Sequence, residues 1–558
     1  MTKHIKIRKH SLILFFGALS IFFLTLSPLI SSGQVVWQDP GSEVYNFLSR
    51  QAQKGNIEFE DLIQPVSRKQ IAFHLRALQD SAFHLSATEK ADLEFYLREF
   101  SEFRTDLDRS DSLTFLKPDA AGRWRFLSVE ENGFLLRGEP VITLGTRQGR
   151  DKSVLEWSNG AAFWGHAGKN LSFQAFFEDI TESGTGIDSI RSFTRREGIV
   201  RTVTLNKNSV NYSRFTGNVT YAWDNGSVSA GKNQILWGYG ENGRLVLSDK
   251  APAYPNIRID YRPLKWLQFH YTHAWLHSGL IDSARSYPKG NSVYGNNREF
   301  FIQKYLATHS LNLYPLKGLS FSLGESMVYS DRLNIAYLFP LMFFKAYDQY
   351  ESRYDVPTGS NGQFFLQASS RNHIPNTHVY TTLFIDEIRM SEIFNPARSR
   401  NQVGFNIGIS ITDPFIPYLT VGAEYTRVNP FAYQNLVPAQ NYSSQAYILG
   451  DWIGQNADRL TGWIKYNPVS RLTTRIQLEI LRKGIDGNID DQYFAEPQPA
   501  FLVGGFETQK QLLVEAKYQL LNQLTINASY FKMRGLIRPA LQPSARPEEF
   551  RFGLSYGL

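Results

Sequence analysis

The C-terminal stretch EEFRFGLSYGL (548–558) alternates strictly between apolar residues and polar or small ones. One face carries Phe550, Phe552, Leu554, Tyr556 and Leu558, and the other carries Arg551, Gly553, Ser555 and Gly557. Successive side chains of a β-strand point to opposite faces, so this pattern predicts a strand with one apolar side. A soluble sandwich has no reason to end on its most regular amphipathic strand. A transmembrane barrel does, because its last strand must pair with its first and turn its apolar side to lipid.

The same alternation recurs from about residue 134 to the end of the chain. Examples are LSFQAFFED (171–179), WLQFHYTHAWLH (266–277), GFNIGISI (404–411), TTRIQLEIL (473–481) and LTINASYFKM (524–533). Clusters of Gly, Asn, Asp and Pro separate roughly 16 to 18 such segments. This number of strands fits a large barrel, a propeller or stacked sandwiches, but no repeat of about 40 to 50 residues supports a propeller. With the terminal strand, the pattern predicts an all-β transmembrane barrel.

Residues 1–33 have the layout of a secretory signal peptide. Four basic residues precede the apolar run LILFFGALSIFFLTL (12–26), and small residues follow it up to Gly33. The alternative is an N-terminal membrane anchor, but the run is short for the ~20 residues that a span requires. Subtracting the four leader charges from the formal net charge of +7 leaves +3, so we expect no nucleic-acid partner. The chain has no cysteine, which excludes disulfides and cysteine-ligated metals.

Residues 41–105 have the apolar spacing of short amphipathic helices. Ser67 with Gln70, and Ser86 with Glu89, each have the spacing of a capping box at a helix start. We therefore predict a small α-helical bundle within residues 34–125, followed by the barrel over residues 126–558. The bundle is expected on the periplasmic side, because an exported chain enters from there.

Residues 238–243, GYGENG, match the G-x-G-x-x-G spacing of a dinucleotide-binding turn. That fingerprint requires a helix directly after it, whereas GRLVLSD (243–249) alternates like a strand. We therefore interpret Gly238, Gly240 and Gly243 as a tight connection in which bulkier residues do not fit, and we expect no cofactor.

The stretch around these glycines, GKNQILWGYGENGRLVLSDKAPAYPNIRI (231–259), resembles the signature of the capsule-assembly Wzi family. The matching positions are Trp237, Gly238, Gly240, Leu247, Ser248, Asp249, Ala251 and Pro255. Looser matches are GESMVYSDRLNIAYLFPLMFF (324–344), LFIDEI (383–388) and PVSRKQIA (65–72).

The resemblance implies an outer-membrane barrel of 18 strands with a periplasmic helical bundle. It also implies a lectin-like role in attaching capsular polysaccharide or exopolysaccharide to the cell surface. The partners would be surface polysaccharide, outer-membrane lipid and, during biogenesis, the barrel-assembly machinery. The alternative function is a porin-type channel.

Sugar binding uses aromatic rings that stack on sugar faces, with polar and basic side chains around them. The residues expected to bind polysaccharide are Trp237, Tyr239, Arg244, Tyr287, Lys289, Tyr294 and Arg298. A second group, Tyr329, Asp331 and Arg332, is predicted to form a polar network that ties the lumen or a loop.

Catalytic and metal sites find little support in the sequence. His273 and His277 would share one face of a strand and His270 the other, so we interpret these histidines as interface or lumen residues rather than metal ligands. The chain has no G-x-S-x-G motif, and Asp386 and Glu387 would face opposite sides of a strand. We therefore predict no catalytic residues and no metal.

Overall fold

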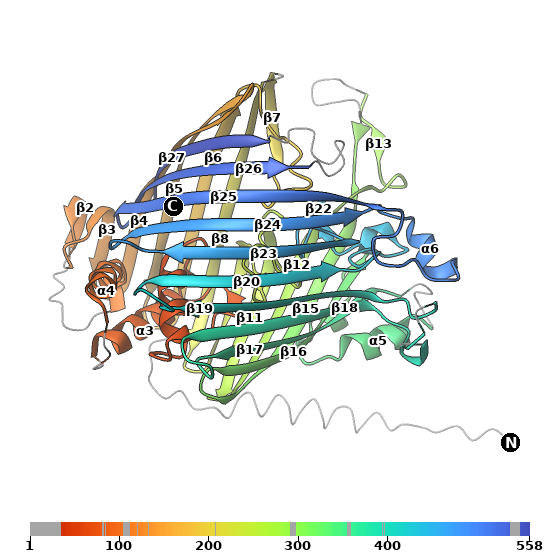
Figure 1. The fold of residues 1–558 in the computed structure, drawn as a ribbon, viewed down its shortest axis with the longest axis horizontal. Helices are drawn as coiled ribbons and strands as arrows, with labels where there is room; N and C mark the ends of the chain where they lie inside the picture. Colours follow the sequence, from red (N-terminus) through yellow and green to blue (C-terminus); the bar gives the residue numbers. More distant parts are fainter. Residues whose placement is uncertain are drawn as a thin grey trace.

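The computed structural model describes residues 35–557, except 81, 82, 84, 104–111, 120, 132, 207, 291–296, 354–358, 393, 396 and 536–546. The predicted signal peptide (1–33), Tyr294 and Leu558 lie outside the described residues. The fold is a closed antiparallel barrel of 18 strands, preceded by the helices α2 (Val44–Gln53), α3 (Arg68–Asp80) and α4 (Ala87–Glu99) (Figure 1). The predicted fold class is therefore confirmed.

The barrel wall begins at Phe134 and ends at Tyr556. Its strands are β4 (Phe134–Gly149), β5 (Ser153–Ala167), β6 (Leu171–Ser183), β8 (Ser209–Trp223), β9 (Gly226–Asn233), β11 (Tyr254–Leu264), β12 (Leu267–Ile281), β15 (Phe301–Leu316), β16 (Leu319–Ser330), β17 (Asn361–Arg371), β18 (Thr377–Glu387), β19 (Gln402–Thr412), β20 (Leu419–Val428), β23 (Ala457–Tyr466), β24 (Leu472–Gly484), β25 (Phe506–Leu521), β26 (Leu524–Arg534) and β27 (Glu548–Tyr556).

Shorter elements lie before the wall and in its loops. They are β1 (Ile63–Gln64), β2 (Ser112–Pro118), β3 (Trp124–Glu131), β7 (Arg201–Asn206), β10 (Leu236–Trp237), β13 (Tyr287–Pro288), β14 (Asn297–Arg298), β21 (Ser443–Ser444), β22 (Tyr447–Ile448), α5 (Phe344–Glu351), α6 (Ile489–Phe494), η1 (Ser101–Phe103), η2 (Ile335–Leu338), η3 (Met390–Glu392) and η4 (Pro438–Gln440). The sequence-based boundary at residue 126 falls inside β3, which pairs with the start of β4 outside the closed wall.

The last strand closes the barrel on the first, as the C-terminal pattern predicts. Leu554 lies opposite Leu144, and Tyr556 lies opposite Ile142. Phe550 and Phe552 are 58% and 55% exposed on the outer face, and Leu554 is 37% exposed. Tyr556 stands at the edge of the belt, where its hydroxyl donates to Glu139. An apolar outer belt of this kind is what a strand needs on its lipid side.

The two ends of the barrel differ in the length of their connections. At one end the strands are joined by short turns such as 168–170, 224–225, 265–266, 317–318 and 522–523. At the other end most connections are long, for example 234–253, 331–360 and 429–456. Figure 1 shows α3, α4 and the β2–β3 hairpin at the first end, and α5, α6 and β13 at the second. We call these the short-turn end and the long-loop end.

The N-terminal helices begin where the capping residues indicate. Ser86 Oγ accepts from the Glu89 N–H and the Glu89 carboxylate accepts from the Ser86 N–H, which completes the predicted capping box. At α3, Ser67 Oγ accepts from the Gln70 N–H. Within the described residues, no helix is long and apolar enough to cross a membrane.

The helices dock on the short-turn end through polar contacts. Arg50 of α2 pairs with Asp413 in the turn between β19 and β20, and Asp92 of α4 accepts from Ser470 and Arg471 in the next turn. The side chain of Asn522, in the turn between β25 and β26, donates to the Phe95 carbonyl. Turns distant in sequence are thus held by one helical segment.

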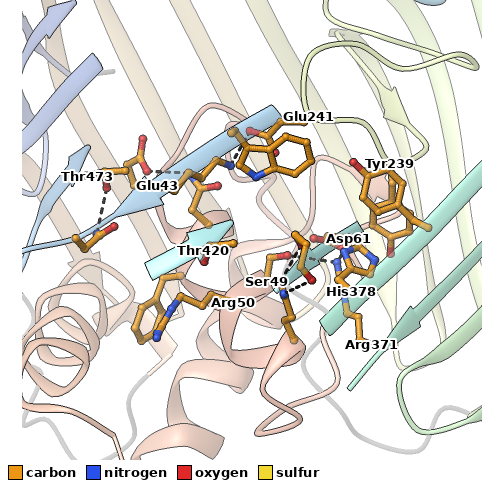
Figure 2. A pocket seen from close by; sticks show the side chains of 18 of the residues that line it. Glu43, Ser49, Arg50, Asp61, Tyr239, Glu241, Arg371, His378, Thr420 and Thr473 are labelled. Atoms are coloured by element: carbon orange, nitrogen blue, oxygen red, sulfur yellow. Dashed lines mark hydrogen bonds and ion pairs between the residues drawn. The ribbon is translucent and has the colours of Figure 1, made fainter. Parts of the chain in front are cut away.

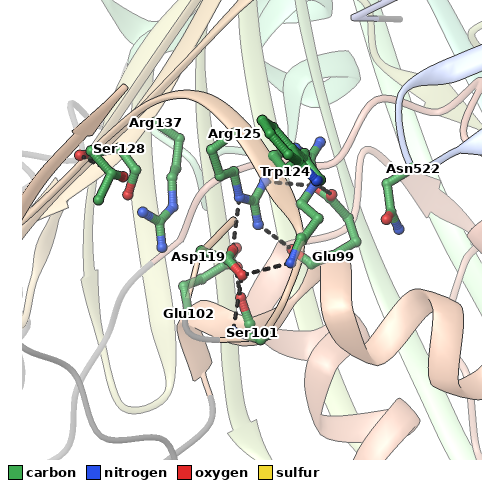
Figure 3. Close-up of polar contacts among 12 residues, drawn as sticks. Glu99, Ser101, Glu102, Asp119, Trp124, Arg125, Ser128, Arg137 and Asn522 are labelled. Carbon is green, nitrogen blue, oxygen red and sulfur yellow. Dashed lines mark hydrogen bonds and ion pairs between the residues drawn. The ribbon is translucent and has the colours of Figure 1, made fainter. Parts of the chain in front are cut away.

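A buried ionic network joins α4 to the first strands (Figure 3). The Glu99 carboxylate lies 2.5 Å from Arg123, 3.5 Å from Arg125 and 3.3 Å from Arg68. Arg123 also pairs with Glu139 on β4 at 2.9 Å. Burial alone would raise the pKa of Glu99, but the three guanidinium groups outweigh it and hold that pKa at about 2. Arg50 and Lys54 likewise hold the pKa of Glu89 at about 2 against the effect of burial.

The docking of the helices should weaken in acid. A carboxylate whose pKa is lowered by folding stabilises the folded state above its unfolded value of 4.5 and loses that contribution as pH falls towards 2. The lowered pKa of Glu99 corresponds to about 3 kcal/mol at neutral pH. A fluorophore on a single cysteine at Phe73 should report a falling urea midpoint for bundle release between pH 4.5 and 2. Glu99→Gln should lower this midpoint at pH 7. The midpoint should then depend less on pH, and only the part due to Glu89 should remain. If the pH profile of this variant matches that of the wild type, Glu99 does not stabilise the docked helices.

Candidate functional site

The barrel lumen is filled by the chain itself. The connection 234–253 enters the lumen, and its strand β10 pairs with β1 from the N-terminal segment, with Ile63 opposite Trp237. A buried core forms here from the N-terminal segment, from loops 184–200, 234–253 and 429–456, and from inward-facing wall residues. A chain segment from each end of the barrel therefore contributes to the plug.

The glycines of residues 238–243 have the steric role that the sequence predicts. Gly238 has φ +105°, and a Cβ on Gly240 would lie 1.8 Å from the Gly243 carbonyl oxygen. The expected strand over 243–249 is wrong: only an isolated bridge between Trp237 and Leu247 forms. The alternating residues of this segment pack into a lumen core, where burial on several sides replaces strand pairing.

Trp237 is not available for sugar stacking. It is fully buried, and its ring lies 4.6 Å from the His270 ring and 5.3 Å from the Phe365 ring in edge contacts. The sequence-based assignment of Trp237 to polysaccharide binding is therefore corrected: this residue is a core residue of the plug.

A buried arginine ties the plug to the wall. Arg459 of β23 makes two 2.9 Å contacts with Asp451 and lies 3.5 Å from Glu424 and 3.9 Å from Glu479. Glu424 in turn accepts from the Glu241 N–H at 2.9 Å, and Glu479 accepts from Asn242. The charge of one guanidinium thus holds both the glycine turn and the loop 429–456.

A polar cavity lies between α2, the glycine turn and the wall near the short-turn end (Figure 2). Its empty volume is about 1020 Å³, including its opening. Tyr239 projects into it, with its ring 5.0 Å from His378, 5.7 Å from Tyr380 and 5.2 Å from the Arg371 guanidinium. Most charges in the lining are neutralised in pairs, such as Arg371 with Asp61 at 2.7 Å.

Two lining residues of the glycine turn differ in their electrostatics. Glu241 is held at 2.8 Å by Lys465 and at 3.0 Å by Arg475, and these cations lower its pKa although burial opposes them. Arg244 donates through Nε to the Gly238 carbonyl at 2.7 Å, and no carboxylate of the described residues pairs with it. Tyr239 and Arg244 together could hold a sugar ring or an anionic group.

The other predicted sugar-binding residues lie at the long-loop end. Tyr287 and Arg298 face each other across the β13–β14 hairpin, and Tyr287 is 51% exposed. The guanidinium groups of Arg285 and Arg298 lie 5.0 Å and 5.4 Å from the Phe300 ring, which stands 6.3 Å from the Tyr287 ring. Lys289 follows β13 in the same hairpin. The structure therefore separates Tyr287, Lys289 and Arg298 from Tyr239 and Arg244.

A second exposed surface at the long-loop end was missed by sequence reasoning. Loops 388–401 and 485–505 are joined by the Arg398–Glu496 ion pair at 2.9 Å and by the Gln498 N–H donating to the Ala397 carbonyl. These loops present Phe394, 96% exposed, and Phe494, 80% exposed. Lone Phe residues in unpatterned loops give no sequence signal, because only the folded loops show that their rings stay in solvent.

The structure corrects the assignment of Tyr329 to a lumen network. Tyr329 has the strand parity of the exposed Phe321 and Leu323, so it lies on the outer face of β16. Its hydroxyl contacts His273 Nε2 at 2.8 Å, and its ring stands 4.6 Å from Tyr337. The parity of the strand, which YSDRL alone does not reveal, places Tyr329 outside the lumen, and Asp331 and Arg332 follow the end of β16.

The histidines of β12 take the two faces expected of a strand. His270 is buried on the lumen side, with Nδ1 2.7 Å from Asp260 and Nε2 3.0 Å from Thr272. His273 lies on the opposite face, against Tyr329. Since the two side chains point apart, they cannot share one metal ion.

A closed 18-stranded barrel with an apolar outer belt and a lumen filled by its own loops and N-terminal segment defines an occluded transmembrane β-barrel. The family model described as capsule assembly protein Wzi matches residues 195–534, more than half of the chain, and the chain belongs to this family. The predicted family is thereby confirmed.

Solved structures similar to this chain include Wzi of Escherichia coli. That protein is described as an outer-membrane protein involved in group 1 capsule assembly and as a carbohydrate-binding β-barrel. It is 13% identical, with a TM-score of 0.56 over 94% of this chain and 99% of that chain. Two Pseudomonas aeruginosa barrels also match: OccK5 (11% identity, TM-score 0.41, 76% and 97% covered) and OprD (12%, 0.40, 81% and 98%). No curated protein matches the sequence.

Proposed function

We propose that this protein is an outer-membrane barrel that binds capsular polysaccharide or exopolysaccharide and holds it at the cell surface without a chemical step. The observation that carries this proposal is the contrast between a closed lumen and an exposed, ring-rich end of the barrel. Its lumen is closed by its own chain, while the loops at one end present aromatic rings and basic groups to solvent. Family membership and the carbohydrate-binding description of the Escherichia coli barrel support the same function.

The filled lumen weighs against the porin alternative. A general porin needs a water-filled pore, and here aromatic and aliphatic side chains from three loops meet the N-terminal segment inside the wall. The likeness to OccK5 and OprD has TM-scores below 0.5, so it carries no argument for or against a porin function.

We further propose that the long-loop end faces the exterior and the N-terminal helices face the periplasm. Outer-membrane barrels have short periplasmic turns and longer external loops, and the helices contact the short turns. This orientation fits an exported chain whose residues 1–33 are a signal peptide. The barrel-assembly machinery would then insert the strands from the periplasm. Lipid would cover the apolar outer belt.

The surface proposed for polysaccharide is the external rim, made of two patches. One is the β13–β14 hairpin with Tyr287, Lys289 and Arg298, to which Tyr294 belongs by sequence. The other is the pair of exposed rings, Phe394 and Phe494, on the joined loops. Rings can stack on sugar faces, and the basic groups of the hairpin suit an acidic polymer.

The proposal is tested by binding of polysaccharide purified from the native cells to the detergent-solubilised barrel. Loss of one exposed ring at a binding centre costs ~1 to 2 kcal/mol, or about five- to thirtyfold in Kd. Tyr287→Ala and Phe494→Ala should each weaken binding to this extent, and cells carrying the double variant should shed polysaccharide. Phe415→Ala is the matched control, because Phe415 is 86% exposed in a turn at the opposite end. Equal losses in all three variants would contradict a binding surface at the rim.

A further inference from the structure

The segment between β16 and β17 folds down over the outside of the barrel wall. It contains η2 (Ile335–Leu338) and α5 (Phe344–Glu351). Along the outer face of β16, Phe321 and Leu323 are exposed, whereas the next outward residues, Glu325, Met327 and Tyr329, are buried. Tyr271 of β12 is buried on the same side, and its hydroxyl donates to the Tyr337 carbonyl at 2.8 Å. The segment therefore covers the long-loop half of this wall.

The wall beneath the segment carries polar side chains that would be unfavourable on the outer face of a barrel if they were exposed to lipid. Glu325 accepts from the Phe344 N–H at 2.6 Å and from the Lys345 N–H at 3.3 Å, so it satisfies the first amide groups of α5. His309 lies 3.1 Å from Glu325 and 2.9 Å from the Pro340 carbonyl oxygen. Removing the cover would leave a carboxylate and an imidazole on the lipid side, which is unfavourable. These bonds fix the segment on the wall.

Between residues 335 and 345, the exposed side chains of the segment are all apolar. Ile335 is 78% exposed, Leu341 55% and Phe343 57%. The Phe343 ring lies 6.2 Å from the Phe364 ring on β17, whose next outward residue is Leu366, 46% exposed. The apolar belt of the barrel thus continues without a break from the strands onto the segment.

We propose that residues 335–345 form a membrane-embedded shoulder whose partner is the acyl chains of the outer leaflet. The segment is a long connection by topology, but its polar backbone is capped by the wall and its apolar side chains face away from it. Glu325 follows Leu323 directly on the outward face, so the cover begins at a depth where the bare wall meets lipid. This inference rests on the proposed membrane location, and it adds an interfacial element that lies beside the barrel.

Because the chain has no cysteine, a single cysteine gives a unique label at each test position. Bimane is attached to Ile335→Cys and Phe343→Cys, and the protein is reconstituted in phosphatidylethanolamine–phosphatidylglycerol vesicles with or without brominated acyl chains. Leu323→Cys is the reference for the belt, and Tyr287→Cys is the reference for a solvent-exposed loop. We expect brominated lipid to quench the labels at 335 and 343 as strongly as the label at 323, and aqueous iodide to quench only the label at 287.

The outcomes separate the alternatives. Quenching of 335 and 343 by iodide would overturn the proposal in favour of an exposed loop. Protection of both labels from both quenchers would overturn it in favour of a protein partner, such as a second copy. If the label at 323 also resists brominated lipid, the membrane location itself fails, which is a distinct result.

A substitution at the anchor tests the docking separately. Glu325→Leu places an apolar residue on the outer face, so the barrel should still form and remain heat-modifiable on gels. Without the carboxylate cap, the label at 343 should lose its lipid quenching and become accessible to iodide. Met327→Leu, a change of similar size beneath the same cover, should leave the label as it is. Retained lipid quenching at 343 in the Glu325→Leu protein would contradict the anchoring by this residue.

Discussion

Phe552→Arg should prevent most of the protein from folding into the membrane. Phe552 is the central residue of β27, 55% exposed on the outer face between Ala528 and Thr146. A basic residue on the lipid side costs roughly 2 to 4 kcal/mol at the bilayer midplane and much less near the interfaces. Because β27 closes the barrel by pairing with β4, this free-energy cost opposes the closing of the barrel. Heat-modifiable gel mobility in outer-membrane fractions should show chiefly unfolded Phe552→Arg.

Two controls use the same strand. Leu554→Arg lies one outward position nearer the short-turn end, so its effect should have the same sign and be smaller. Ser555→Arg points to the lumen side, where Thr143 and Thr525 are its neighbours, and it should fold nearly as the wild type does. If Ser555→Arg is as damaging as Phe552→Arg, the strand faces are assigned the wrong way round.

Arg459→Met should unlock the plug while the wall persists. The substitution leaves Asp451, Glu424 and Glu479 without their shared cation inside the barrel. Removing one partner from a buried charge cluster typically costs about 3 to 5 kcal/mol. Both the glycine turn and the loop 429–456 depend on these carboxylates, so both should loosen. In planar bilayers, the wild type should give little steady current, and Arg459→Met should give larger and fluctuating conductance.

Arg482→Met is the matched control for this effect. Arg482 belongs to the neighbouring strand and pairs with Asp458, but its side chain is 41% exposed. Exposed ion pairs contribute about 0 to 1 kcal/mol, so conductance should stay at the wild-type level. A current in Arg482→Met equal to that in Arg459→Met would show that general loosening of the wall, rather than release of the plug, lets ions through.

The sequence by itself determined the features that depend on local periodicity. Alternation of side chains has a period of two in any strand, so the barrel wall, its apolar belt and its closure through β27 could be read from residues 134–558. Capping depends on residues three positions apart, so the start of α4 at Ser86 was equally visible. The tight turn was predictable because the close approach of Gly240 to Gly243 acts within six residues, whereas the approach of Gly238 to Gln367 and of Gly243 to Asp451 depends on distant segments.

Only the tertiary structure decided where each polar or aromatic residue points once the chain leaves the regular wall. Residues 243–249 alternate like a strand, yet they pack inside the plug, because a closed lumen buries them from several directions. Trp237 has the composition of a sugar-binding residue but is buried by contacts with Phe365 and His270, more than thirty residues away in sequence. Tyr329 faces outward because a one-residue difference in strand parity exchanges the lumen side of the wall for its outer side, where the covering segment buries the ring. The residue pattern along the chain predicts the two faces of each strand. Contacts between segments distant in sequence decide whether a given side chain on those faces is exposed or buried.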